Sequence, residues 1–411
     1  MITEEQIDLL VERLIRRIEE ANTYFLKKIG SSVAKIKELT PTQAHQLVQI
    51  LKYGGSYEEI IKEIARYTDL NIKDIDEIFS AYAKKDYVFY KKFYQYRNIP
   101  YIPYEQNIAL RTQTQALANI VKNEAYNYFR TNVLGYTIKD LNGRGRFLGL
   151  RETYNMVLDN ALLNVSQGKE TFDSAMTRIM EQIGGSGLKT LEYESGRGVR
   201  LDSAIRMHLK GRLRELHNEN QKIIGEEIGT DGVEISVHAN PAPDHELAQG
   251  HQFTNEEFDK LQAGLVALDY KGRAITLDHD NKSGYRPISE MNCYHYIFTI
   301  VLGVSEPLYT DEQLQKIIED NEKGFELDGK HYSLYDGEQL LRKVELELRK
   351  SKDIQIIARS SNNAELVGKT QSKITQLTSK YRDILKASGL KSKLERARVS
   401  GYKRINIKKS N

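Results

Sequence analysis

The stretch that decides the architecture opens with the alternating sequence VEISVH at residues 233–238 and closes with the apolar run from Ile297 to Gly303. This alternation predicts a short strand, because successive side chains of a strand point to opposite faces. Four of the seven prolines, the single cysteine and five of the nine histidines lie between Asp231 and Pro307. Helical patterns flank the stretch on both sides. The sequence therefore predicts a small α+β module carried by a predominantly α-helical protein.

Length and composition indicate a soluble protein of several parts. A chain of 411 residues is too long for one ordinary core and predicts about two to four domains. It contains no run of about 18 apolar residues, as a membrane helix needs, and residues 1–6 lack the features of a signal peptide. A single cysteine excludes an internal disulfide framework, which suits a reducing cytosol. We expect no membrane contact.

Four regions are expected along the chain. They are an N-terminal helical bundle, a second helical region, the central module, and a basic helical region with a flexible tail, over residues 1–104, 105–187, 188–307 and 308–411. The connector at 98–104 sets the first boundary, because a residue that precedes proline is biased away from helix.

Apolar spacing and capping residues predict the helices of the first two regions. One helix is expected over 3–29, with Gly30 as its stop, and separate helices over 56–67 and 71–97. The second region is expected to consist of helices, with the loop at 142–146 between the first of them and a helix over 152–165.

Further helices and hairpins are expected from the third region onward. Turn residues predict hairpins over 188–200 and 325–332, and apolar spacing predicts helices over 202–228, 335–360 and 363–388.

The segment 84–97 alternates aromatic and basic residues. Lysines beside stacking rings are typical of a single-stranded nucleic-acid surface. Tyr87, Tyr90 and Tyr94, however, share one helical face, and rings at this spacing more often form a core or a subunit interface. We therefore expect a core.

Positive charge is concentrated at the C-terminus. Residues 349–411 contain 17 Lys and Arg against 4 Asp and Glu, a net charge of +13, whereas the preceding residues carry −10. Such a tail on an acidic body is typical of contact with nucleic acid or an acidic partner, although a solvated basic surface remains the alternative. The last 22 residues are expected to be unfolded when free. The candidate DNA-binding residues are Lys391, Lys393, Arg396, Arg398, Lys403, Arg404, Lys408 and Lys409.

Histidines and the cysteine of the central module are candidate metal ligands. Zinc requires four nitrogen or sulfur ligands, and the candidates are His238, His245, His251, Cys293 and His295. Neither a C-x-x-C nor an H-x-x-x-H pair is present, so the sequence favours the metal-free interpretation, in which these residues hydrogen-bond strand ends and loops. Asp244, His245, Cys293 and His295 are expected to be neighbours that join the two ends of the module.

Catalytic alternatives are weaker. Cys293 with a histidine could form a nucleophilic pair, and Asp244 and His245 with residues 278–280 could form a metal-dependent nuclease. Walker A, dinucleotide-binding and nucleophile-elbow motifs are absent from the sequence. ADP-ribosyl transfer would need a Glu-x-Glu motif beside a sheet, whereas Glu345 and Glu347 fall in a predicted helix.

Taken together, the motifs of the central module resemble those of the phage minor capsid protein 2 family, which is related to the Mu F-like head-morphogenesis proteins. The motif residues are Asp244, His245, Gly250, Phe253, Asn292, Cys293 and His295. Similar motifs occur at 38–45, 101–104, 201–207, 303–307 and 329–335, so the resemblance covers nearly the whole chain.

This resemblance implies a virion protein without catalytic activity. Such proteins assemble in the host cytoplasm, enter the capsid near the portal, and contact the portal protein, other capsid or scaffold proteins and sometimes double-stranded DNA without sequence specificity. Mu F-like modules often have a cysteine pair where Asp244 and His245 stand here, which leaves the metal question open. The alternatives are a nuclease or toxin-like enzyme delivered with the genome, and a module that binds host DNA.

Overall fold

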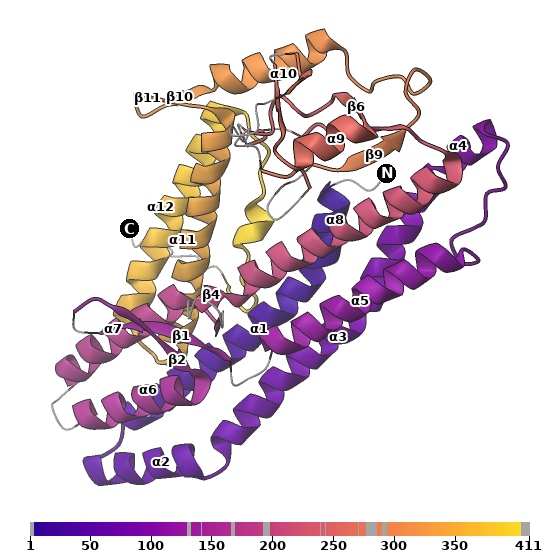
Figure 1. The fold of residues 1–411 in the computed structure, drawn as a ribbon. Coiled ribbons are helices and arrows are strands. Elements are labelled where there is room, and N and C mark those ends of the chain that lie inside the picture. The colour runs from indigo at the N-terminus through magenta and orange to yellow at the C-terminus, as the bar shows by residue number, and fades with distance from the viewer. Residues whose placement is uncertain are drawn as a thin grey trace.

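Long helices that lie side by side make up most of the molecule (Figure 1). The computed structural model describes residues 4–129, 133–140, 142–165, 169–191, 198–238, 240–242, 244–269, 271–276, 286–289, 293 and 295–403. Twelve α-helices and small antiparallel sheets within these ranges confirm the predominantly α-helical α+β class. Among the same residues, none of the helices combines the length and the apolarity that a bilayer crossing requires.

Four helices run lengthwise beside one another and form the centre of a helical body, namely α1 (Glu4–Lys37), α3 (Ser56–Phe89), α5 (Ile108–Phe129) and α8 (Leu201–Ile228). The shorter helices are α2 (Pro41–Tyr53), α4 (Lys91–Tyr96), α6 (Leu150–Val165) and α7 (Lys169–Ser186). A single hydrophobic core joins Val11, Leu110, Leu201 and Ile354, so apolar packing links all four predicted regions. The region boundaries themselves stay predictions.

Gly30 does not end the first helix, contrary to the sequence prediction. Helix α1 continues through it to Lys37 and crosses α11 (Leu334–Ser360) at this point. A Cβ atom on Gly30 would lie 2.6 Å from the Cβ of Ser360 and 2.7 Å from the carbonyl oxygen of Ile357. The glycine therefore allows two helices to pack closely, which sequence spacing alone does not distinguish from a helix stop.

The predicted break between residues 67 and 71 is also wrong, since α3 is one continuous helix. Ile64 and Ile75, on either side of the expected break, are both buried in the same core, and this tertiary packing outweighs the capping preference of Asn71. The core interpretation of the aromatic segment is confirmed for Tyr87 and Tyr90, which are almost fully buried.

A β-hairpin interrupts the second region, where the sequence predicted only helices and a loop at 142–146. Strands β1 (Leu134–Lys139) and β2 (Gly145–Gly149) pair with β3 (Lys189–Leu191) and β4 (Gly198–Arg200) in the order β2-β1-β3-β4. The β1–β2 turn is held by the Asp140 carboxylate, which accepts hydrogen bonds from two backbone N–H groups. Tyr136 of β1 is fully buried and stacks on Phe25 of α1, so packing against the helical body stabilises this strand.

The central module contains a three-stranded antiparallel sheet in the order β6-β5-β9, with bounds β5 (Gly232–Ile235), β6 (Gln252–Thr254) and β9 (Ile297–Ile300). Helix α9 (Asn255–Gln262) and the hairpin β7 (Val266–Leu268) and β8 (Ala274–Thr276) complete it. The module has a hydrophobic core of its own, which includes Ile235, Phe253 and Ile297. It lies against one end of α8 (Figure 1).

The C-terminal region is a helical hairpin, as predicted. After α10 (Asp311–Lys323) and the hairpin β10 (Phe325–Leu327) and β11 (Lys330–Tyr332), helix α11 packs along α12 (Ala364–Ser388). The prediction of an unfolded tail is wrong for residues 390–403, which fold back onto the protein and include η1 (Leu394–Ala397) and a turn at 400–401. Ala397 is fully buried, and the backbone of Ser400 forms hydrogen bonds with α1. The segment can pack in this way because apolar residues separate its basic ones. Residues 404–411 lie outside the described ranges.

Candidate functional site

Three side chains of the central module form a buried cluster. His245 lies in the turn at 244–250, and Cys293 and His295 lie in the segment that leads into β9. Cys293 Sγ is 3.5 Å from His245 Nδ1 and 3.3 Å from His295 Nδ1. All three residues are at most 5% exposed. The structure therefore brings the two ends of the module together at these residues.

Hydrogen bonds on the outer side of the cluster orient both imidazoles. His245 Nε2 lies 2.8 Å from the carbonyl oxygen of Arg286, and His295 Nε2 lies 3.4 Å from Oε1 of Gln249. Asp244 stands beside the cluster, where its carboxylate accepts hydrogen bonds of 2.7 and 2.8 Å from the Arg286 guanidinium. This ion pair fixes the carbonyl that His245 faces.

The environment shifts the three pKa values in different directions. Burial lowers the pKa of His245, but the contacts with Cys293, the Arg286 carbonyl and Asp244 together raise it above its ordinary value. Burial raises the pKa of the Cys293 thiol, but hydrogen bonds from His245 and from backbone N–H groups bring it below its ordinary value. Burial and the neighbouring His238 and His245 lower the pKa of His295 to about 2. The neutral imidazole of His295 thus adjoins the Cys293 thiol, which ionises readily. Nitrogen and sulfur atoms of this kind can either hydrogen-bond to each other or bind a metal ion.

The two other predicted metal ligands lie in different parts of the module. The ring of His238 lies beside the cluster, with its centroid 4.3 Å from that of His295. His251 lies elsewhere, against the backbone of Gly272.

The remaining motif residues shape the module. Gly250 has a φ of +76°, and a Cβ there would lie 2.4 Å from Leu314, so only glycine fits without strain. Phe253 is part of the core of the module. Asn292 and residues 278–280, which the nuclease hypothesis requires, lie outside the described residues.

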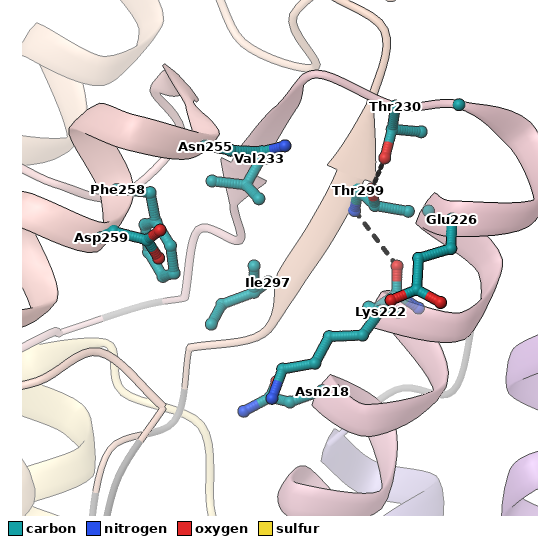
Figure 2. A pocket seen from close by; sticks show the side chains of 13 residues that line it. Asn218, Lys222, Glu226, Thr230, Val233, Asn255, Phe258, Asp259, Ile297 and Thr299 are labelled. Carbon is teal, nitrogen blue, oxygen red and sulfur yellow. Dashed lines mark hydrogen bonds between the residues drawn. The ribbon is translucent and has the colours of Figure 1, made fainter.

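A cavity of about 460 Å³ lies between α8, α9 and the three-stranded sheet, and the sequence does not predict it. Figure 2 shows Asn218, Lys222 and Glu226 of α8 on one side and Phe258 and Asp259 of α9 on the other. Gln221 also lines the cavity, and its side-chain oxygen accepts a hydrogen bond from the backbone N–H of Thr299. Its lining residues have no common spacing in the sequence, so no motif indicates this cavity.

Positive charge in the C-terminal region is only partly exposed. Of the predicted DNA-binding residues, Lys391, Arg398 and Lys403 are exposed, whereas Lys393 and Arg396 are half-buried. Lys393 lies 3.5 Å from the carboxylate of Glu338. Arg404, Lys408 and Lys409 lie outside the described residues. Helix α12 has five exposed cations that the tail prediction omitted. Lys369 and Lys373 pair with Glu181 and Glu347, and the other three are Lys380, Arg382 and Lys386.

A buried ionic cluster in the helical body also has no motif in the sequence. Arg200 lies 3.1 Å from Asp202 and 3.4 Å from Asp353, and Arg349 of α11 pairs with Asp202. Burial raises the pKa of Asp202, but Arg200 and Arg349 bring it below its ordinary value. Burial raises the pKa of Asp353 to about 6, against the opposing effect of Arg200. These contacts join the start of α8 to the C-terminal hairpin.

Comparison with known proteins assigns the chain. The family model described as phage minor capsid protein 2 matches residues 2–386, nearly the whole chain. No curated protein and no solved structure shows significant similarity to it. The chain belongs to the phage minor capsid protein 2 family, and this membership gives it a structural role in the phage capsid and a place in the virion.

Proposed function

We propose that this minor capsid protein acts in head morphogenesis at the portal vertex, where its basic C-terminal region contacts packaged double-stranded DNA. The observation that carries the DNA contact is the charge distribution, since residues 349–411 have a net charge of +13 and the rest of the chain carries −10. The acidic body would then face protein partners, such as the portal protein and other capsid or scaffold proteins.

The exposed cations of this region suit contact with phosphate groups. Lys380, Arg382 and Lys386 extend from α12, which lies at the outside of the molecule (Figure 1), and Arg398 and Lys403 are exposed on the segment that follows. Flexible, solvated side chains of this kind neutralise phosphates without reading base edges. We therefore expect binding that is indifferent to DNA sequence and sensitive to salt.

The role is proposed to be structural rather than catalytic. A nucleophilic Cys293 would need access to a substrate, yet the residue is 5% exposed and its sulfur faces two buried histidines. This burial supports a cluster that holds the module together.

A salt series with matched variants tests the DNA contact. Changing Lys380, Arg382, Lys386, Arg398 and Lys403 to Gln removes five exposed cations from the C-terminal region. The control changes five exposed cations of the body to Gln, namely Arg16, Lys35, Lys62, Lys85 and Lys139. Both variants have the same net charge, so only the position of the removed charge differs.

Duplex DNA binding is measured from low to physiological salt. The slope of log affinity against log salt is expected to become shallower by about 0.9 for each phosphate that the C-terminal variant no longer neutralises, and to stay unchanged in the control. Equal slopes for the two variants would show that the C-terminal region does not bind the DNA.

A further inference from the structure

The two sulfur–nitrogen distances in the buried cluster of the central module match those of a tetrahedral metal site. In a tetrahedral zinc site the Zn–S bond is about 2.3 Å and the Zn–N bond about 2.0–2.1 Å, which places sulfur and nitrogen about 3.6 Å apart. The corresponding distances from Cys293 Sγ are 3.5 Å to His245 and 3.3 Å to His295. The ligand atoms of all three residues lie within 4.8 Å of one another.

In each neutral imidazole the proton lies on Nε2, so that the lone pair of Nδ1 faces the sulfur. A carbonyl oxygen only accepts hydrogen bonds, so the Arg286 carbonyl requires an N–H at His245 Nε2. Oε1 of Gln249 accepts the backbone N–H of His238, which fixes the orientation of this amide, and it therefore accepts from His295 Nε2 as well. Metal-binding histidines commonly donate their second N–H to an oxygen in this way.

The same hydrogen bonds leave a mismatch without a metal. In the neutral imidazoles both Nδ1 atoms carry a lone pair that points at Cys293 Sγ, and the thiol has a single proton to share between them. If that proton passes to His245, the His245 ring donates to the thiolate, but the lone pair of His295 Nδ1 still faces the sulfur without a donor. One buried acceptor would remain unsatisfied, which is costly in a buried site. A cation between a thiolate and two imidazole lone pairs removes this mismatch.

We propose that Cys293, His245 and His295 bind one structural zinc ion, with His238 as the fourth ligand. Thiolate and imidazole favour zinc over magnesium or calcium, which prefer oxygen ligands. His238 is the candidate for the fourth position because its ring adjoins that of His295, and a rotation of this ring would have to bring one of its nitrogens to the three ligand atoms that already lie together. The burial of the other three ligands leaves them out of reach of a substrate, so the site is structural rather than catalytic.

The ion would fasten the turn at 244–250 to the segment before β9. His245 and Cys293 are 48 residues apart in the sequence, so one ion would close the segment between them into a loop. The metal site is independent of the proposed contacts with the portal and DNA.

Metal analysis of the untagged full-length protein, purified without chelators, tests the site. The wild type and a His251→Gln control are expected to contain about one zinc per chain, because His251 belongs to the module but not to the cluster. Cys293→Ser and His245→Gln are expected to lose the zinc. His238→Gln is expected to weaken zinc binding at least tenfold, and unchanged affinity would overturn its assignment as the fourth ligand.

A cobalt titration of the wild type covers the case in which the ligand variants fail to fold. Cobalt in the proposed site is expected to give thiolate-to-metal charge-transfer absorption and the intense visible bands of tetrahedral coordination, and zinc is expected to displace it. Wild-type protein that contains no zinc and gives no such absorption with cobalt would overturn the proposal.

Discussion

The helical body and the central module are held together by different means. The body has a continuous apolar core that extends over helices from both halves of the chain and encloses an ionic cluster. The module has short strands and a small core, and its ends meet through His245, Cys293 and His295. Long helices bury enough apolar surface to define their own packing, whereas short strands depend on specific polar contacts.

Asp202→Ala is expected to have the largest effect, because it removes the carboxylate that two arginines share in the buried ionic cluster of the body. The substitution leaves Arg200 and Arg349 buried without their shared carboxylate. We expect a loss of about 3–5 kcal/mol in the free energy of unfolding, measured by urea denaturation. Asp383→Ala on the exposed face of α12 is the control, with an expected change within about 0.5 kcal/mol. Similar losses in both variants would contradict the structural role of the cluster.

His217→Ala tests the link between the two regions. The buried imidazole lies 2.9 Å from the Asp86 carboxylate of α3 and 2.8 Å from the Ile297 carbonyl of β9. Its removal leaves two buried acceptors unsatisfied and is expected to cost about 1–3 kcal/mol. Hydrogen exchange should become faster in β9 and β5 while α1 stays protected.

Replacing the exposed His45 by Ala is the control for this link and should leave both regions unchanged. Equal acceleration of exchange in α1 and β9 by His217→Ala would show that the body and the module do not respond separately.

Glu19→Gln tests the pH dependence of the body, and its effect is expected to be small at pH 4 and to grow as the pH rises. Burial and the neighbouring Asp202, Glu12 and Asp353 raise the pKa of Glu19 from 4.5 to about 8. The folded state therefore binds this proton more tightly than the unfolded state, so stability falls as pH rises from about 5 to 8. The variant should remove part of this fall and have a higher Tm than the wild type at pH 8.

At pH 4, where Glu19 is protonated in both states, the advantage of the variant should disappear. A Tm difference that is the same at pH 4 and pH 8 would contradict the raised pKa.

Sequence patterns predict the helices better than the contacts between them. The bounds of α11, α12 and the β10–β11 hairpin follow from capping residues and an Asp-Gly turn. The role of Gly30 does not, because a helix stop and a close helix crossing have the same sequence signal. Hairpin β1–β2 escapes prediction because its strands are short and β3, the second partner of β1, lies far along the chain.

For the candidate site too, the sequence predicts which residues lie close together better than it predicts the contacts that orient them. The proximity of His245, Cys293 and His295 could be predicted from their positions at the two ends of one module. The orientation of their ring nitrogens depends on Arg286 and Gln249, which no motif indicates. The Arg200–Asp202–Asp353 cluster likewise joins residues that only the fold brings together.

Cross-linking mass spectrometry of assembled phage heads that contain this chain tests the central claim most directly. A minor capsid protein at the portal vertex is expected to be present in few copies and to cross-link to the portal protein through the acidic body. Heads that contain the chain but yield cross-links to the major capsid protein alone would contradict the proposed position at the portal.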